Sequence, residues 1–406
     1  MIKRETYLNR IIPFVDTELI KVITGVRRSG KSVMLQLVQD YLVEQGVKRS
    51  QILALNFEEL INEQYLDYHV LNKHIEDVIA ANNGKTYVFL DEIQAVHSFE
   101  KTINSLRASH RDSVDIYITG SNAKLLSGEL ATLLSGRYVR FEIYPFTFSE
   151  FVQGKRSIGI NASNNEFFQM FMLEGGMPFP IFQDLAYKDR VNYLSDVYSS
   201  IMLKDIIERE TIREPELLRR LLNYLFANSG RTFSANSIVK HLKSQGMSAS
   251  VTTILNYLRY AQSAYAIVAL PRYDIQGKKY FSSHEKYYVI DHGLRQAIVG
   301  RNIEDVELVL ENIVLFELIS RGYAVKVGKT DRYEVDFVAE KMSRQGMERA
   351  YFQVSYLLAA PETREREFRA LESIPDNHAK TVLSMDPITS SSGGIMHKNL
   401  IEWLLE

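Results

Sequence analysis

The chain has 406 residues, of which 46% are hydrophobic and 11% aromatic, and its formal net charge is −2. This length predicts more than one domain, the charge argues against a surface that binds polyanions everywhere, and the absence of cysteine excludes disulfides and thiolate metal sites. Because the sequence shows neither a signal-like N-terminus nor an apolar run of about 20 residues, we expect a cytoplasmic protein without a membrane partner.

A phosphate-binding motif follows the first predicted strand. The strand is LIKVITG, residues 19–25, and the residues after the motif have helical spacing. Between them GVRRSGKS, residues 25–32, matches G-x-x-x-x-G-K-[ST] in full, which predicts an ATP site at a helix N-terminus. The alternative is an ordinary glycine turn. The predicted nucleotide-binding residues here are Gly25, Val26, Arg27, Arg28, Ser29, Gly30, Lys31, Ser32 and Val33.

Each part of this motif has an expected role. The two glycines let the backbone wrap a phosphate closely, Lys31 reaches the β- and γ-phosphates, and Ser32 holds Mg²⁺. A second acid for Mg²⁺ is expected from TYVFLDEIQ, residues 86–94, where Asp91 ends an apolar strand. Glu92 then polarises the attacking water, so the pair predicts hydrolysis as well as binding.

Three further strands complete the predicted sheet. Residues 114–122 end in Ser121 and Asn122, which we expect to contact the γ-phosphate or the water; the alternative is a turn that closes the strand. Strands at 51–59 and 134–146 and helices at about 66–80 and 99–110 give a parallel α/β sheet with the ligand beyond the carboxyl ends of its strands.

Arg137 stands at the start of the last of these strands. One interpretation is an arginine finger that completes the site of a neighbouring subunit in a homo-oligomer, with a catalytic role beside Lys31 and Glu92. The alternative, which the sequence does not separate from it, is a salt-bridged surface residue.

The middle of the chain divides into two predicted regions. Residues 147–211 read as helices with a break near Gly175, and we expect them to form a lid over the nucleotide. Residues 212–290 read as three helices, at 214–230, 233–246 and 248–267, followed by strands within 268–291, which is the order of a winged helix-turn-helix.

Charge favours double-stranded DNA as the partner of the winged helix. Residues 213–281 hold ten Lys or Arg and three acids, in a chain that is slightly acidic overall. The helix of residues 248–267 would enter the major groove, and the strands would follow the backbone. The alternative is a platform for another protein or an extension of the lid. The predicted DNA contacts are Ser248, Ser250, Thr252, Thr253, Asn256, Lys278 and Lys279.

Residues 291–406 have the element order of a restriction-endonuclease-like core. A helix at 306–322 precedes three strand-like runs at 323–328, 332–340 and 349–356, then a helix at 361–374 and a strand at 379–386. Such a core gathers Mg²⁺ with a helix Glu, a strand Asp and a Glu/Gln-x-Lys pair.

The predicted metal ligands of this core are incomplete. Glu311 or Glu317 would be the helix ligand, Asp336 the strand ligand, and Gln353 would offer a carbonyl oxygen. Ser355 stands where the Lys belongs and carries no charge. Removing one electrostatic stabiliser of this kind costs on the order of 10²–10³ in rate, so we expect a degenerate domain that binds and does not cut. The alternative is that Lys326 or Lys341 enters the site in space.

Several motifs together resemble a family of prokaryotic AAA-type ATPases with a C-terminal domain of unknown function. The motifs are GVRRSGKS, FLDEIQ, ITGSNA, LSGRYVRFEIYPFTFSEF and YYVIDHGLR, and the resemblance covers nearly the whole chain. The resemblance implies ATP as ligand, a RecA-like ATPase core and a nuclease-like tail.

The predicted fold class is α/β, with four regions: a P-loop AAA-type core at 1–146, a helical lid at 147–211, a winged helix at 212–290 and a restriction-endonuclease-like domain at 291–406. The predicted function is a Mg²⁺-dependent ATPase that couples hydrolysis to DNA binding. The alternatives are an ATP-dependent nuclease using Asp336 and a helix Glu, and a nucleotide-gated signalling or scaffold protein.

Overall fold

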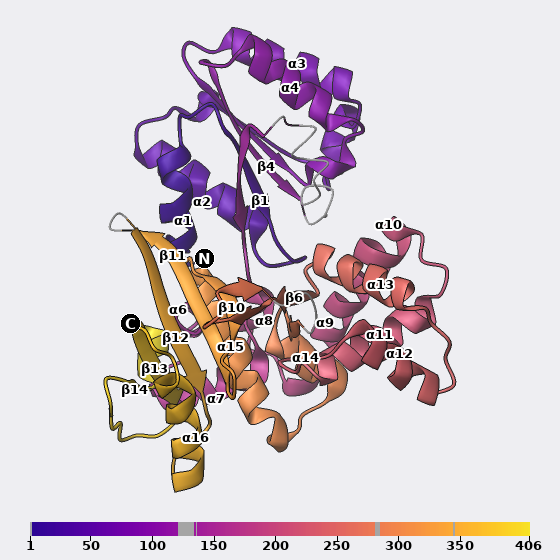
Figure 1. Ribbon diagram of the computed structural model, residues 1–406. Coiled ribbons are helices and arrows are strands. Elements are labelled where there is room, and N and C mark those ends of the chain that lie inside the picture. Colours follow the sequence, from indigo (N-terminus) through magenta and orange to yellow (C-terminus); the bar gives the residue numbers. More distant parts are fainter. Residues whose placement is uncertain (1, 121–133, 135, 281–284, 344–345) are drawn as a thin grey trace. The chain divides into compact units, whose positions relative to one another are not determined.

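The computed structural model describes residues 2–120, 134, 136–280, 285–343 and 346–406 (Figure 1). The chain divides into two compact units, Met1–Tyr144 and Pro145–Glu406, and each is described by itself. The division of the second unit at positions 211 and 290 stays a prediction.

The first unit is built on a five-stranded parallel sheet with the strand order β2-β3-β4-β1-β5. All five strands lie where apolar runs predicted them. Their bounds are β1 Ile20–Thr24, β2 Ile52–Asn56, β3 Thr86–Asp91, β4 Val114–Gly120 and β5 Tyr138–Glu142. Every residue of β1, β3 and β4 is buried, as expected for the central strands of a parallel sheet that is covered on both faces.

Helices cover both faces of this sheet (Figure 1). Alternate strand residues point to opposite sides. Val22 and Val88 pack with α3 and α4, whereas Ile23 and Phe89 pack with α1 and α2. The helices are α1 Glu5–Ile11, α2 Lys31–Glu44, α3 Tyr68–Ala81 and α4 Phe99–Ser109, with short 3₁₀ turns at Ile12–Phe14, Arg49–Gln51, Leu60–Tyr65 and Ile93–Ala95. The predicted α/β core with a parallel sheet is therefore confirmed.

The second unit begins with helices, as predicted. Thr147 and Ser163 open α6 and α7 with capping boxes that end on Glu150 and Glu166. Gly175 ends α7 at φ 75°, which confirms the break expected there. The elements are α6 Phe148–Ser157, α7 Asn164–Glu174, α8 Pro178–Ile181, α9 Tyr187–Ser200, a π-helical turn Ile201–Ile207 and α10 Glu208–Glu210.

Three helices and four short strands follow in the expected order. They are α11 Pro215–Ala227, α12 Ala235–Ser244, α13 Val251–Ser263, β6 Ile267–Leu270, β7 Arg272–Asp274, β8 Lys279–Tyr280 and β9 Lys286–Val289. The strands do not form one free hairpin, because β6 pairs with β9 while β7 and β8 join a larger sheet. β7 and β8 do form the expected antiparallel hairpin with Gly277 in its turn, but β10 pairs with the other edge of β7, so this hairpin is part of the larger sheet.

That larger sheet has seven strands in the order β14-β13-β12-β11-β10-β7-β8. β11 is antiparallel to both β10 and β12, whereas β12 pairs in parallel with β13, and β7 in parallel with β10. The sheet therefore contains strands from both sides of position 290. The remaining elements are α14 His292–Val299, a 3₁₀ turn Ile303–Asp305, α15 Val306–Ser320, β10 Ala324–Lys329, β11 Glu334–Ser343, β12 Gly346–Val354, α16 Pro361–Glu372, β13 Ala379–Ser384, β14 Met396–Asn399 and α17 Leu400–Leu405.

Candidate functional site

The loop between β1 and α2 has the backbone of a phosphate cradle. Gly25, Arg28 and Gly30 all have positive φ, at 147°, 65° and 97°. A Cβ on Gly25 would clash with the backbone oxygen of Ile143, whereas a Cβ on Gly30 would meet nothing within 4 Å. Gly25 is thus required by packing, and Gly30 leaves open space at the point where α2 begins. Backbone N–H groups at such a helix N-terminus favour an anion.

Lys31 lies at the mouth of this cradle with its side chain 4% exposed. Its Nζ donates to the carbonyl oxygen of Val26 at 3.2 Å and lies 3.9 Å from Glu92 Oε1. Two buried hydroxyls of the same loop region, Thr24 Oγ1 and Ser29 Oγ, have no hydrogen-bond partner among the described residues. Ser32 and Val33 are exposed on the first turn of α2. This arrangement offers a buried cation and polar atoms to a phosphate ligand.

The two predicted acids lie at the carboxyl end of β3, the strand next but one to β1 in the sheet. Asp91 is buried, and Thr119 Oγ1 on β4 donates to its Oδ1. The same hydroxyl accepts the N–H of Glu92 at 3.0 Å, and Gln94 Nε2 donates to the Glu92 carboxylate. Glu92 is half-buried at φ 53°, a left-handed backbone conformation that turns the chain sharply after the strand.

Strand order explains why these residues meet. β4 lies between β1 and β3, so its last residues approach both the Lys31 loop and the acids. Sequence reasoning missed Thr119, although its place before the predicted sensor residues was the available signal. Ser121 and Asn122 lie outside the described residues.

Arg137 is far from its own phosphate cradle. It precedes β5, which is parallel to β1, and its carbonyl oxygen accepts the N–H of Ile20 at the first residue of β1. Its side chain is exposed near Arg107, whose pKa is lowered by burial and then by the charge of Arg137. Arg137 therefore lies at the amino-terminal edge of the sheet, so a role in the same subunit's site is excluded. A role in the site of another copy stays a prediction.

The predicted DNA contacts are partly exposed. Ser248, Ser250 and Thr252 are exposed at the start of α13, but Thr253 and Asn256 are half-buried. Ser250 Oγ caps the helix by accepting the Thr253 N–H at 3.0 Å and also contacts Thr253 Oγ1 at 2.9 Å. These two hydroxyls are committed to the helix end, which leaves Ser248 and Thr252 as the accessible hydroxyls.

Cations surround this helix pair. Lys240, Lys243 and Arg259 are exposed on α12 and α13, and Lys278 is exposed in the turn between β7 and β8 at φ 50°. Nothing is described of the side chain of Lys279. Two apolar side chains also face solvent on α13, Val251 at 36% and Leu255 at 54% exposure.

In the C-terminal sheet, the two strand residues expected at a metal site contact each other. Gln353 Oε1 accepts the N–H of Asp336 at 2.8 Å, and Gln353 Nε2 donates to Glu367 Oε2 at 2.6 Å. Asp336 Oδ2 accepts the N–H of Val354 at 2.9 Å. Ser355 is buried, and its hydroxyl donates to the carbonyl of Leu357 at 3.4 Å.

Glu311, and not Glu317, is the helix acid near Asp336. Burial and the neighbouring Glu311 raise the pKa of Asp336 well above its ordinary value. Burial also raises the pKa of Glu311, against the lowering effect of Lys286 on β9. Lys286 Nζ lies 3.3 Å from Glu311 Oε2 and 3.0 Å from Glu334 Oε1. Sequence reasoning missed Lys286, because it lies 25 residues before Glu311 on a strand outside the expected core.

The two lysines considered from the sequence are engaged elsewhere. Lys326 Nζ donates to Glu340 at 2.6 Å, and Lys341 lies 3.5 Å from Glu348. The hypothesis that one of them completes the site is therefore wrong, because cross-strand neighbours already neutralise both.

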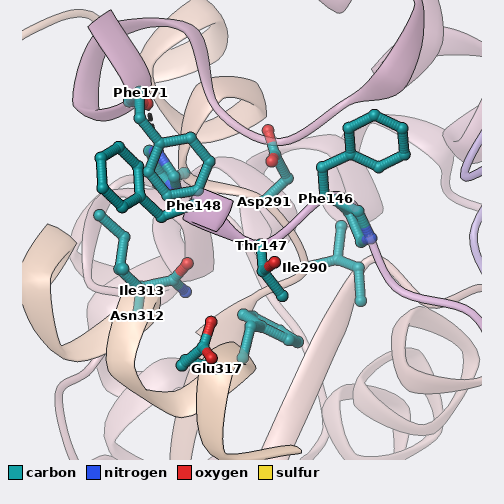
Figure 2. A pocket seen from close by; sticks show the side chains of 12 residues that line it. Phe146, Thr147, Phe148, Phe171, Ile290, Asp291, Asn312, Ile313 and Glu317 are labelled. Carbon is teal, nitrogen blue, oxygen red and sulfur yellow. Dashed lines mark hydrogen bonds between the residues drawn. The ribbon is translucent and has the colours of Figure 1, made fainter. Parts of the chain in front are cut away.

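Glu317 lines a separate small pocket between α15 and the segment around Phe146 (Figure 2). Its Oε1 accepts from Arg321 Nε at 2.7 Å, and burial raises its pKa. Glu317 Oε2 and Asn312 Oδ1 have no hydrogen-bond partner among the described residues. The pocket has room for about one water molecule.

Two kinds of feature are absent from the described parts of the chain. Within them no group of three or more His, Cys, Asp or Glu side chains is arranged to hold a metal ion. Among the helices described, none has the length and apolar character to cross a membrane.

Comparison with known proteins gives two domain matches. Residues 17–152 match an AAA domain, and residues 165–305 match a domain of unknown function. An uncharacterized protein of Haemophilus influenzae is 38% identical over 407 residues, which covers 100% of this chain and 99% of that protein. An uncharacterized protein of Methanocaldococcus jannaschii is 33% identical, covering 91% of this chain and 82% of that one.

A solved structure shares the fold. The Walker-type ATPase of Pyrococcus abyssi superposes with a TM-score of 0.52 at 15% identity, covering 73% of this chain and 95% of that chain. The predicted AAA domain with a P-loop ATPase fold is therefore confirmed.

Proposed function

The chain belongs to the same family as the Haemophilus influenzae protein that it matches from end to end, and on that premise we propose that it is a Mg²⁺-dependent ATPase. One observation carries the proposal: Lys31, Asp91 and Glu92 meet at the carboxyl edge of one parallel sheet, with Lys31 Nζ 3.9 Å from Glu92 Oε1.

The residues present fit ATP with Mg²⁺. Gly30 leaves open space beside the helix N-terminus, and the unpartnered hydroxyls of Thr24 and Ser29 need a polar neighbour. The loop backbone and Lys31 would hold the β- and γ-phosphates, and Ser32 with Asp91 would hold Mg²⁺. Bound together, ATP and Mg²⁺ supply the transferable phosphoryl group and neutralise its charge.

Within this site the protein's own groups divide the work. Thr119 holds Asp91 and the backbone of Glu92 through one hydroxyl, so both acids keep a fixed place at the strand end. Glu92 is half-buried and oriented by Gln94, which suits a carboxylate that positions water and takes its proton. Lys31 supplies positive charge where negative charge is transferred.

The test is steady-state ATP hydrolysis with nucleotide binding measured in parallel. Lys31→Ala should lose both turnover and nucleotide affinity. Glu92→Gln should keep nucleotide affinity and lose turnover by roughly 10²–10³-fold. Lys48→Ala and Glu63→Gln, exposed residues of the same unit, are the matched controls and should hydrolyse ATP normally. Unchanged hydrolysis in either site variant refutes the assignment.

We also propose that ATP turnover is coupled to double-stranded DNA through a winged-helix-like region, α11 to β9. What supports this is the group of exposed cations Lys240, Lys243, Arg259 and Lys278, none of which has an ion-pair partner among the described residues. Phosphate neutralisation by such cations makes binding salt-dependent. Ser248 and Thr252 would lie nearest the bases.

Salt titrations of DNA binding test this second part. Replacing Lys243 or Arg259 by Ala should weaken binding and lower the slope of log affinity against log salt by about one each. Arg219→Ala is the control, because Arg219 is exposed but already bonded to Glu216 at 2.7 Å and should change the slope less. The proposal is contradicted if DNA affinity does not depend on salt concentration. It is also contradicted if ATP turnover does not change when double-stranded DNA is added.

A protein partner is the alternative that one observation favours. Leu255 and Val251 expose apolar surface on α13. Exposed apolar surface is typical of a protein-binding face, whereas a DNA-binding face requires little of it. If α13 binds protein, Leu255→Ser should abolish that binding while DNA affinity, where present, changes little.

A further inference from the structure

Lys286 lies among the carboxylates that a nuclease with a restriction-endonuclease-like core would use to bind metal. Its ammonium group contacts Glu311 at 3.3 Å and Glu334 at 3.0 Å, and its side chain is only 7% exposed. Asp336 acts on it electrostatically as well. Three carboxylates from α15 and β11 therefore surround one organic cation contributed by β9.

One side-chain oxygen of each expected ligand, Glu311, Asp336 and Gln353, already accepts a hydrogen bond. Glu311 Oε2 accepts from both Lys286 Nζ and the hydroxyl of Tyr288, the latter at 2.9 Å. Asp336 Oδ2 and Gln353 Oε1 each accept a backbone N–H across the β11–β12 ladder. The Gln353 amide nitrogen is bound to Glu367 and would repel a cation. Mg²⁺ demands several oxygens in near-octahedral geometry, so this donor set does not fit it.

We propose that Lys286 takes the place of the metal ion, so that the C-terminal centre binds no divalent cation, does not cut DNA and instead anchors β9 to α15 and β11. The anchor is internal to one unit, and it joins the β6–β9 pair to the sheet that holds Asp336. The inference stands independently of ATP hydrolysis.

The charges explain why Lys286 and a divalent cation exclude each other. The ammonium group of Lys286 is buried between Glu311 and Glu334, at 3.3 and 3.0 Å, and these two carboxylates hold its charge in place. A fixed positive charge among the carboxylates repels a second cation at short range in a weakly screened site. Removing the ammonium group leaves an unbalanced negative centre, which a divalent cation can then neutralise.

Manganese binding to the nucleotide-free full-length chain tests the inference. Lys31→Ala serves as the parent, so that the P-loop contributes as little as possible, and free Mn²⁺ is followed by electron paramagnetic resonance. The parent should bind no Mn²⁺ at this centre. Adding Lys286→Ala should tighten Mn²⁺ binding by at least about tenfold, and adding Asp336→Asn to that variant should remove the gain.

The control is Lys326→Ala, a second partly buried lysine of the same unit that faces a carboxylate, Glu340, at 2.6 Å. It should not gain Mn²⁺ affinity, because it leaves the Asp336 centre unchanged. If Lys286→Ala fails to fold, the test rests on the Lys31→Ala parent and the wild-type chain. The inference is then supported if the parent binds no Mn²⁺ at this centre and the wild-type chain does not cut DNA.

Two results would overturn it. One is Mn²⁺ binding by the parent that Asp336→Asn abolishes, since the centre would then accept metal with Lys286 present. The other is Mg²⁺-dependent cutting of DNA by the wild-type chain. If Lys286→Ala and Asp336→Asn each abolished that cutting, Lys286 would be a relocated catalytic lysine and the domain a working nuclease.

Discussion

Two buried lysines, one in each unit, show how differently the same side chain is used. Lys31 begins a helix, donates a hydrogen bond to a backbone carbonyl at 3.2 Å and lies 3.9 Å from Glu92 Oε1. Lys286 lies on a strand, with carboxylates at 3.0 and 3.3 Å. In the loop that holds Lys31, the hydroxyls of Thr24 and Ser29 have no hydrogen-bond partner among the described residues. Near Lys286, by contrast, Glu311 Oε2, Gln353 Oε1 and Asp336 Oδ2 each accept a hydrogen bond.

The difference lies in what neutralises each charge. The protein itself supplies the counter-charge of Lys286, so that charge contributes to holding three elements together. In the proposed function a ligand phosphate would complete the site of Lys31, and the charge of Lys31 would then contribute to binding. A buried lysine is therefore better judged by its partners than by its burial.

The largest expected effect separates the two lysines by stability. Lys286→Met should destabilise the second unit by roughly 3–5 kcal/mol, because it leaves buried carboxylates without their counter-charge. Lys31→Met should cost about 1 kcal/mol, the usual contribution of a hydrogen bond such as the one from Lys31 Nζ to the carbonyl oxygen of Val26. Hydrogen exchange at increasing urea concentrations measures the free energy of unfolding of each unit in both variants.

The pH dependence follows from the raised pKa of Lys286. Its stabilisation is fully present below the ordinary lysine pKa of about 10.4 and is lost only as pH rises through the higher folded value. Equal destabilisation by Lys286→Met and Lys31→Met would contradict the expected difference between the two lysines.

The next largest effect is expected at Gly25 in the phosphate cradle, where an added Cβ would clash with the backbone oxygen of Ile143. Gly25→Ala should reduce nucleotide affinity and turnover by about 10²-fold, an amount equal to roughly 2.7 kcal/mol, because the Cβ would push the loop away from Ile143. Gly46→Ala is the control: Gly46 also has positive φ, at 95°, but its Cβ would meet nothing within 4 Å. Equal losses in both variants would show that backbone strain, and not the clash, matters.

A smaller effect is expected at Thr119. Thr119→Val removes the hydroxyl that holds Asp91 and the Glu92 backbone, so turnover should fall by about 10–100-fold with little change in ATP affinity. Thr102→Val is matched in burial, and its hydroxyl bonds only the carbonyl of Tyr68 at 2.8 Å. Normal turnover in Thr119→Val would mean that the acids hold their place without it.

The smallest effect belongs to an exposed ion pair. Hydrogen bonds from Arg219 and Arg220 lower the pKa of Glu216 to about 2. The stability it contributes is therefore present above the ordinary glutamate pKa and is lost as pH falls through the folded value. Because the group is fully exposed, Glu216→Gln should shift the melting temperature far less than Lys286→Met at neutral pH. Melting curves at neutral and acidic pH check this, and a shift as large as that of Lys286→Met would contradict it.

Much of the fold was predictable from local pattern. The five parallel strands of the first unit follow apolar runs, and the predicted helix at 66–80 is α3 at Tyr68–Ala81. Gly175 ended its helix as expected. These elements are set by hydrophobic periodicity and by glycine's access to positive φ, both of which are local properties.

The sites were predictable only where neighbours in sequence make them. The GVRRSGKS loop carries its own backbone geometry, and Asp91 and Glu92 follow their strand directly. Thr119 was missed because its role depends on β4 lying between β1 and β3. Lys286 was missed because it comes from β9, a strand that pairs outside the C-terminal sheet.

The sequence by itself therefore determined the nucleotide cradle, the α/β alternation of the first unit and the lack of a lysine at position 355. Tertiary structure decided that Arg137 lies at the wrong edge for its own P-loop, that Glu311 and not Glu317 faces Asp336, and that Lys286 balances that centre. The physical reason is that strand order and the packing of distant segments place these charges, and neither is encoded in local periodicity.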